Sequence, residues 1–145
     1  MVVKTYKGLL AHGAHDRIRL STIKGKVGYR IIKFAIIAID PNESVENVVK
    51  IYMTEQTTID TDVNFSDANL LACAMWWSST GQDNVHDTVV IFDREIVNQD
   101  IYVTNADNNG AAAMNYYIEL EVIPLTDQAA EYTTLKDIRT QLTIS

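Results

Sequence analysis

The stretch MNYYIELEVIPL, residues 114–125, alternates apolar and polar side chains more clearly than any other part of the chain. The first series is Tyr116, Ile118, Leu120 and Val122, and the second is Tyr117, Glu119 and Glu121. Because successive side chains of a strand point to opposite faces, this alternation predicts a β-strand. We expect one of its faces to pack on a core and the other to meet water.

Strand-like runs also occupy most of the chain before this stretch, over residues 2–10, 18–23, 27–39, 48–54, 70–77, 85–93 and 96–104. About eight strands predict an all-β fold, and we expect an antiparallel β-sandwich that is jelly-roll-like. An immunoglobulin-like sandwich is the nearest alternative.

Four segments carry more detailed predictions. The run FAIIAI at residues 34–39 predicts burial on both faces of its strand. The run LLACAMWW at residues 70–77 fits either a short helix or an inner strand. Residues 93–95 are short enough to close a tight hairpin between the runs beside them. Residues 105–110, NADNNG, have the composition of a turn.

The C-terminal tail changes its periodicity. Thr126 can cap a helix, and apolar residues recur at helical spacing as Leu135, Ile138 and Leu142. We therefore expect either one short amphipathic helix over residues 127–142 or a helical turn followed by an arm. The predicted organisation is a β-sandwich domain over residues 1–125 and a helix or arm over residues 126–145, packed on the same domain or on a neighbour.

The composition excludes several classes of protein. A chain of 145 residues is long enough to bury a core without staples, and its single Cys73 excludes an internal disulfide and cysteine-based metal clusters. The longest apolar stretch, residues 31–39, contains Lys33 and is shorter than a membrane span requires. No signal-peptide core opens the chain, so we expect a protein made in a reducing cytoplasm, without membrane contact.

The net charge of −7 conceals a division along the chain. Residues 1–39 hold eight basic side chains and one acidic side chain, whereas residues 40–145 hold four basic and eighteen acidic ones. In one interpretation the basic strands pair with acidic strands such as 114–125, opposite Glu119 and Glu121. In the other they present a positive surface to an acidic partner. The acidic remainder and the absence of interleaved aromatics argue against a nucleic-acid partner.

Clusters typical of catalysis or metal binding are weak. His12 and His15 are three residues apart, followed by Asp16, in a segment that reads as a loop. The Asp60–Asn64 segment and the 105–110 turn both lack residues that a calcium loop requires. Cys73 lies in an apolar run typical of a buried, inert thiol, and no nucleophile or phosphate-binding motif is present. We therefore expect no enzyme activity, no cofactor and no metal.

Trp76 and Trp77 are the most informative aromatic residues. On a strand, adjacent side chains point to opposite faces, so one indole can join the core while the other lies outside. An outward tryptophan can anchor an interface or stack on a sugar. The alternative is that both are buried, one of them beneath a loop.

Three stretches of the sequence resemble small proteins encoded by marine tailed bacteriophages. Two are in the C-terminal half, VIFDREIVNQDIYVT and NYYIELEVIPLTDQAAEYTTLKDIRTQL, and one is in the first third, RIRLSTIKGKVGYRIIKF. The resemblance implies a virion structural protein, most plausibly one that decorates the head.

The leading functional hypothesis is therefore a capsid decoration (cement) protein on the outer capsid surface of the virion, synthesised in the host bacterial cytoplasm. Its expected partners are the major capsid protein and further copies of itself, with a trimer favoured. The alternative hypothesis is a carbohydrate-binding or host-recognition module of a phage fibre or tail. The residues predicted to form interfaces are Lys4, Lys7, Arg17, Arg19, Trp76, Trp77, Leu135, Ile138 and Leu142.

Overall fold

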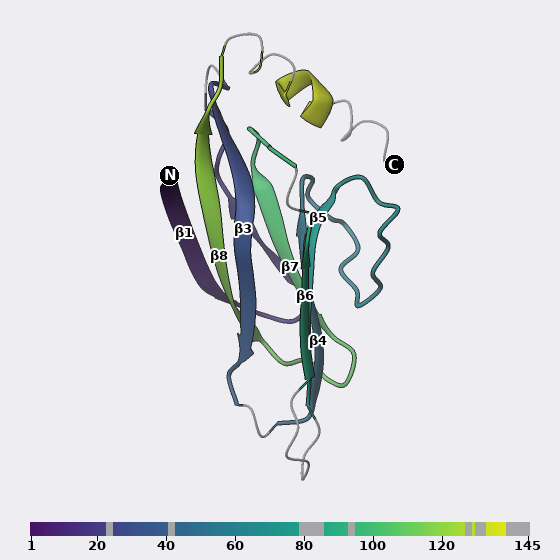
Figure 1. Cartoon of the computed structure of the whole chain (residues 1–145). Coiled ribbons are helices and arrows are strands. Elements are labelled where there is room, and N and C mark those ends of the chain that lie inside the picture. The colour runs from purple at the N-terminus through teal and green to yellow at the C-terminus, as the bar shows by residue number, and fades with distance from the viewer. Residues whose placement is uncertain are drawn as a thin grey trace.

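The computed structural model describes residues 1–22, 25–40, 43–78, 86–92, 95–126, 129 and 133–138. Eight strands form two antiparallel sheets packed face to face, as Figure 1 shows. The strands are β1 (Val2–Leu10), β2 (Ala14–Ile18), β3 (Val27–Ala38), β4 (Val45–Tyr52), β5 (Leu70–Ser78), β6 (His86–Ile91), β7 (Ile101–Asp107) and β8 (Met114–Pro124). The predicted all-β antiparallel sandwich is confirmed.

The strand order is jelly-roll-like. One sheet has the order β1-β8-β3 and the other β2-β7-β4-β5-β6. Three strand pairs are those of a jelly roll, in which a long hairpin is rolled up: β1 with β8, β2 with β7, and β4 with β5. The sixth strand departs from this scheme, because β6 pairs with β5 and not with β3. The predicted hairpin closed by residues 93–95 is wrong, since β4 and β5 separate β6 from β7.

The core lies between the sheets and follows the alternation of β8. Met114, Ile118 and Leu120 of β8 are fully buried, and they meet the inward side chains of the five-stranded sheet, such as Ile51 and Val103. Burial of an aliphatic side chain of this size stabilises a fold by about 1.5–3 kcal/mol. The predicted inward and outward faces of residues 114–125 are therefore confirmed.

The strand β3 corrects one prediction. Phe34, Ile36 and Ala38 are buried, but Ile37 between them is 60% exposed and Ile39 is also exposed. The run FAIIAI therefore has one buried face and one open face, not two buried faces. β3 is an edge strand of its sheet, and no segment among the described residues covers the outer side chains of this sheet.

Two buried amides tie the sheets together at one end of the core. Asn47 Nδ2 donates to Asn105 Oδ1 (2.9 Å), and Asn105 Nδ2 donates to the Leu10 carbonyl at the end of β1 (2.9 Å). Asn105 therefore lies inside β7, and the predicted turn begins later, at Asn108. Asp107 closes this turn, because its carboxylate accepts backbone hydrogen bonds from Glu46, Asn109 and Ala112.

A short helix over residues 133–138 follows the sandwich and lies across one end of it (Figure 1). Residue 129 is also helical, and the rest of the predicted helix, including Leu142, lies outside the described residues. The buried residues are polar, Thr133 and Asp137, whereas Leu135 and Ile138 are 59% and 42% exposed. The option that Leu135 and Ile138 cover the end of the sandwich is therefore wrong. Within the described chain, no helix has the length and hydropathy needed to cross a membrane.

Candidate interaction surfaces

The outer side of the three-stranded sheet is an uncovered surface, which we call the bare face. Its most exposed large apolar side chains are Leu9 on β1 and Ile37 on β3, with 56% and 60% of their surface open to water. Both are in register with Asn115 of β8, so they flank one row across the sheet. Val3 and Ile32 add further exposed apolar groups nearer its other end. These apolar side chains lie on one face with polar residues between them, and exposed apolar groups that gather on one face are a feature of interaction sites.

Charged side chains on the bare face are partly neutralised within it. Arg30 on β3 forms a salt bridge with Glu121 of β8 (2.7 Å), and Lys33 is in register with Glu119. The Tyr117 hydroxyl donates to Glu119 (2.6 Å), which raises the pKa of this phenol through the hydrogen bond. The basic strand thus does lie opposite the glutamates of residues 114–125. Such half-exposed pairs contribute about 0–1 kcal/mol each.

The strand β1 is an edge of the sheet and carries two of the predicted interface residues. Lys7 is exposed, and no acidic side chain of the described chain lies within ion-pair distance of its ammonium group. Lys4 is exposed as well, with its ammonium group 5.8 Å from the centre of the Tyr29 ring. Both cations are therefore available to an acidic partner. An edge strand also presents unpaired backbone groups, which natural proteins often flank with lysine.

Arg17 and Arg19 differ in their environments although they are two residues apart. The Arg17 guanidinium donates to Asp100 (2.7 Å), so this residue is engaged within the chain. Burial alone would raise the pKa of Asp100, but hydrogen bonds from Ser21, Arg17 and Leu20 lower it to about 2. Arg19 is exposed and makes no ion pair with the described residues.

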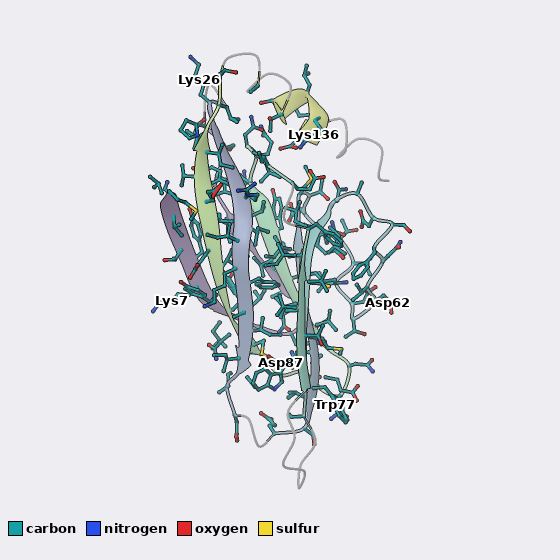
Figure 2. The ribbon with its side chains drawn as sticks, in the orientation of Figure 1. Lys7, Lys26, Asp62, Trp77, Asp87 and Lys136 are labelled. Carbon is teal, nitrogen blue, oxygen red and sulfur yellow. The ribbon has the colours of Figure 1, made fainter. Side chains whose placement is uncertain are left out.

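The tryptophan pair divides between the two faces of β5, and both side chains have intermediate exposure. Trp76 points inward and packs against the core, and its buried Nε1 finds no hydrogen-bond acceptor among the described residues. Trp77 points to the outer side of the five-stranded sheet. It lies near the end of the molecule remote from Lys136, as Figure 2 shows.

Trp77 lines a hollow of about 480 Å³ on this outer side, which we call the Trp77 hollow. Its floor comes from Trp77 and Met75 of β5 and Val48 of β4, and Glu46, which is in register with Trp77, lies at its edge. Its walls come from Asn108, in the turn after β7, and Thr61, in the segment between β4 and β5. The segment 79–81, which follows Trp77 in the sequence, lies outside the described residues.

The wall that carries Thr61 is fixed by a buried lysine. The segment 53–69 folds back over the outer side of the five-stranded sheet (Figure 1), and Lys50 projects beneath it. Its Nζ donates to Asp60 Oδ1 (3.3 Å) and to the Asp62 carbonyl (2.5 Å). The oxygens considered above as calcium ligands therefore face an ammonium group. Cys73 is buried beside Lys50, and burial raises the pKa of its thiol.

The two histidines of the AHGAHD segment point to different partners. His12 Nδ1 accepts a hydrogen bond from the backbone of Asp107 (2.9 Å), whereas His15 lies in β2, 3.2 Å from Glu55. Segment 14–18 is therefore strand and not loop. In the part of the chain that the structure describes, no three metal-ligating side chains converge on one point.

The C-terminal helix is held by polar contacts. The backbone amide of Asn98 donates to Asp137 Oδ2 (3.1 Å), and the Asn98 side chain donates to Thr134 (2.5 Å) and to the Gly25 carbonyl (3.0 Å). Burial raises the pKa of Asp137 to about 6. These contacts orient the helix so that Leu135 and Ile138 face outward, as a second exposed apolar surface.

Comparison with known protein families, curated proteins and solved structures gave no match. Evidence for a function therefore comes from the bare face, the Trp77 hollow and the exposed side of the C-terminal helix. Sequence reasoning identified Trp77 and Lys7 but missed the open side of β3 and the other residues around the hollow. The one available signal was their two-residue spacing along a strand. Glu46 and Val48, for example, lie on either side of Asn47 and therefore share one face of β4.

Proposed function

We propose that this protein is a capsid decoration protein that attaches to the outer head shell of a tailed bacteriophage. The observation that carries the proposal is the bare face, where Leu9 and Ile37 expose more than half of their surface on a sheet that no other described segment covers. The resemblance of residues 17–34, 90–104 and 115–142 to small phage proteins indicates which partner to expect, namely the major capsid protein.

The chemistry of the bare face and its edge suits an acidic shell. Leu9 and Ile37 supply apolar area, and Lys7 supplies a cation on the same face. Lys4 adds a second cation at the edge strand, on the other side of β1, and neither lysine is engaged by acids within the described chain. A specific protein interface buries about 1,200–2,000 Å² in total. Repeating such a contact over a symmetric shell adds many small gains, which resist the pressure of packaged DNA.

The C-terminal helix suits contacts between copies of the chain. Leu135 and Ile138 face away from their own sandwich, so they can pack against a neighbouring copy in a homo-oligomer. We favour a trimer, because a closed ring lets each copy use the same helix to contact its neighbours. In this arrangement each copy contacts the major capsid protein through the bare face and its neighbours through the helix.

The test compares phage particles that lack this protein before and after purified protein is added back. We expect the protein to bind to the particles and to raise the temperature at which they release DNA, measured with a DNA-binding dye. A Leu9→Asp/Ile37→Asp variant should bind at least about tenfold more weakly, a change of about 1.4 kcal/mol, because two carboxylates would enter an apolar contact.

Val63→Asp is the matched control, since Val63 is also an exposed aliphatic residue but lies in the 53–69 segment, away from the bare face. It should behave as the unmodified protein does. The proposal is wrong if the Leu9→Asp/Ile37→Asp variant binds normally, or if particles release DNA at the same temperature with and without the protein.

A further inference from the structure

The Trp77 hollow combines an apolar floor with polar groups held in place. Trp77, Met75 and Val48 form the floor, and Met75 is 45% exposed although it lies in the middle of a sheet. This exposure places a thioether and an indole beside each other at an open concave surface. Pockets that bind small ligands are typically apolar with a few fixed polar groups, and their volumes are about 300–1,000 Å³.

The polar groups are a carboxylate and an amide that bind each other. Asn108 Nδ2 donates to Glu46 Oε2 (3.1 Å), so the two side chains form one polar edge of the hollow. Their backbones are fixed as well, because the Asn108 amide donates to the Glu46 carbonyl (3.0 Å) and the Glu46 amide donates to Asp107 (3.0 Å). A fixed polar edge loses little conformational entropy when it binds a ligand.

We propose that the Trp77 hollow binds a neutral hexopyranose unit of a glycan. The apolar face of a pyranose ring can lie on the indole and the thioether, while neighbouring hydroxyl groups bind the carboxylate and the amide. Glu46 is the only charged residue that lines the hollow among the described residues, so an anionic sugar would meet a negative charge and no cation from these residues. This site goes beyond the attachment role proposed above and does not depend on it.

The geometry of the sandwich makes the two roles compatible. The bare face lies on the outside of one sheet and the Trp77 hollow on the outside of the other. Lys7 of the first sheet and Asp62 of the segment that covers the second lie on opposite sides of the molecule in Figure 2. A copy attached through the bare face would therefore present the hollow away from its attachment surface.

The test uses the full chain carrying Trp76→Phe, so that Trp77 is the only tryptophan and can be excited selectively over the tyrosines. Methyl glycosides of glucose, galactose and mannose are titrated, with N-acetylneuraminic acid as the anionic comparison. We expect a saturable change in fluorescence with at least one neutral glycoside, with a dissociation constant of ~1 mM, and none with the acidic sugar. Two-dimensional amide NMR on the same samples should show shifts at Glu46, Met75 and Asn108.

Two variants of the otherwise unmodified chain, followed by NMR, decide whether the hollow itself is responsible. Trp77→Ala should weaken binding at least tenfold, and Asn108→Ala, at an exposed turn position, should do so without altering the fold. Phe65→Ala is the control, because Phe65 is an exposed aromatic residue remote from Trp77 in the sequence and outside the hollow. Absence of saturable binding by every neutral glycoside would overturn the proposal, as would unchanged binding by Asn108→Ala or equal binding of the acidic sugar. None of these results would contradict the proposed attachment of the protein to phage particles.

Discussion

Asp137 attaches the C-terminal helix to the sandwich through a fully buried carboxyl group. Its Oδ2 accepts one backbone hydrogen bond from Asn98, and Lys136 lies 3.7 Å from its Oδ1, which has no hydrogen-bond partner among the described residues. Burial raises its pKa from 3.8 to about 6. The folded state therefore retains a proton that the unfolded state has lost between about pH 4 and pH 6, and stability falls as pH rises through this range.

We predict that Asp137→Asn raises the free energy of unfolding at pH 7 by about 2 kcal/mol. Asparagine keeps an acceptor for the Asn98 amide and removes the buried charge. The measurement is urea unfolding at pH 4, 5, 6 and 7, in which the unmodified protein should lose stability as pH rises and the variant should not. Equal pH dependence of the two proteins would show that Asp137 is not the group responsible.

Lys50 has a different role, because its buried ammonium group attaches an exposed segment to a sheet. We predict that Lys50→Met changes global stability by less than about 1 kcal/mol, since an apolar side chain of similar volume can replace a buried cation. Amide hydrogens near Asp60 and Asp62 should nevertheless exchange faster, because the contacts of Lys50 with these residues disappear.

Hydrogen exchange measured by mass spectrometry checks this prediction, with Lys7→Met as the control on the opposite side of the molecule. The control should leave exchange in residues 57–64 unchanged. If Lys50→Met also leaves it unchanged, the segment is held by other contacts.

At the scale of elements, β8 was predictable because its apolar and polar side chains alternate, which indicates the face that meets water. The run at residues 34–39 was not, since an unbroken apolar run looks the same whether its second face meets a core or remains open. The strand order could not be predicted either, because strands that are neighbours in the sequence need not pair in the sheet. The runs at 85–93 and 96–104 are adjacent in the chain, but β6 pairs with β5 and β7 pairs with β2 and β4.

The C-terminal helix shows how periodicity identifies an apolar side without saying what that side contacts. Leu135 and Ile138 do recur at helical spacing, yet polar contacts of Asp137 and Thr134 turn them outward. Similarly, the Trp77 hollow draws residues from segments near positions 46, 61, 75 and 108. Only the tryptophan drew attention in the sequence, because the other residues are ordinary until the fold brings them together.

We predict that Leu135→Glu/Ile138→Glu reduces self-association and leaves monomer stability within about 0.5 kcal/mol of its original value, because both side chains are exposed. Sedimentation velocity of the unmodified chain should show an oligomer, with a trimer favoured. A Val63→Glu control should not alter it. An oligomer that survives the helix variant, or a chain that is monomeric at every concentration, would exclude the helix as the contact between copies.

At the scale of the whole molecule, the charge division along the chain is only partly resolved within the fold. Arg30 with Glu121 and Arg17 with Asp100 neutralise some of the basic segment. Lys7 and Arg19 remain without an acidic partner among the described residues. Pairing within the fold therefore applies to Arg30 and Arg17, and an acidic partner for Lys7 and Arg19 stays a prediction.

The most direct test of the proposed decoration role is the position of this chain in an electron-microscopy reconstruction of the phage particle that contains it. We predict density on the outer head shell, with β1, β8 and β3 facing the major capsid protein and Trp77 facing away from it. Density confined to the tail, or a head-bound chain whose bare face is open to solvent, would contradict the account.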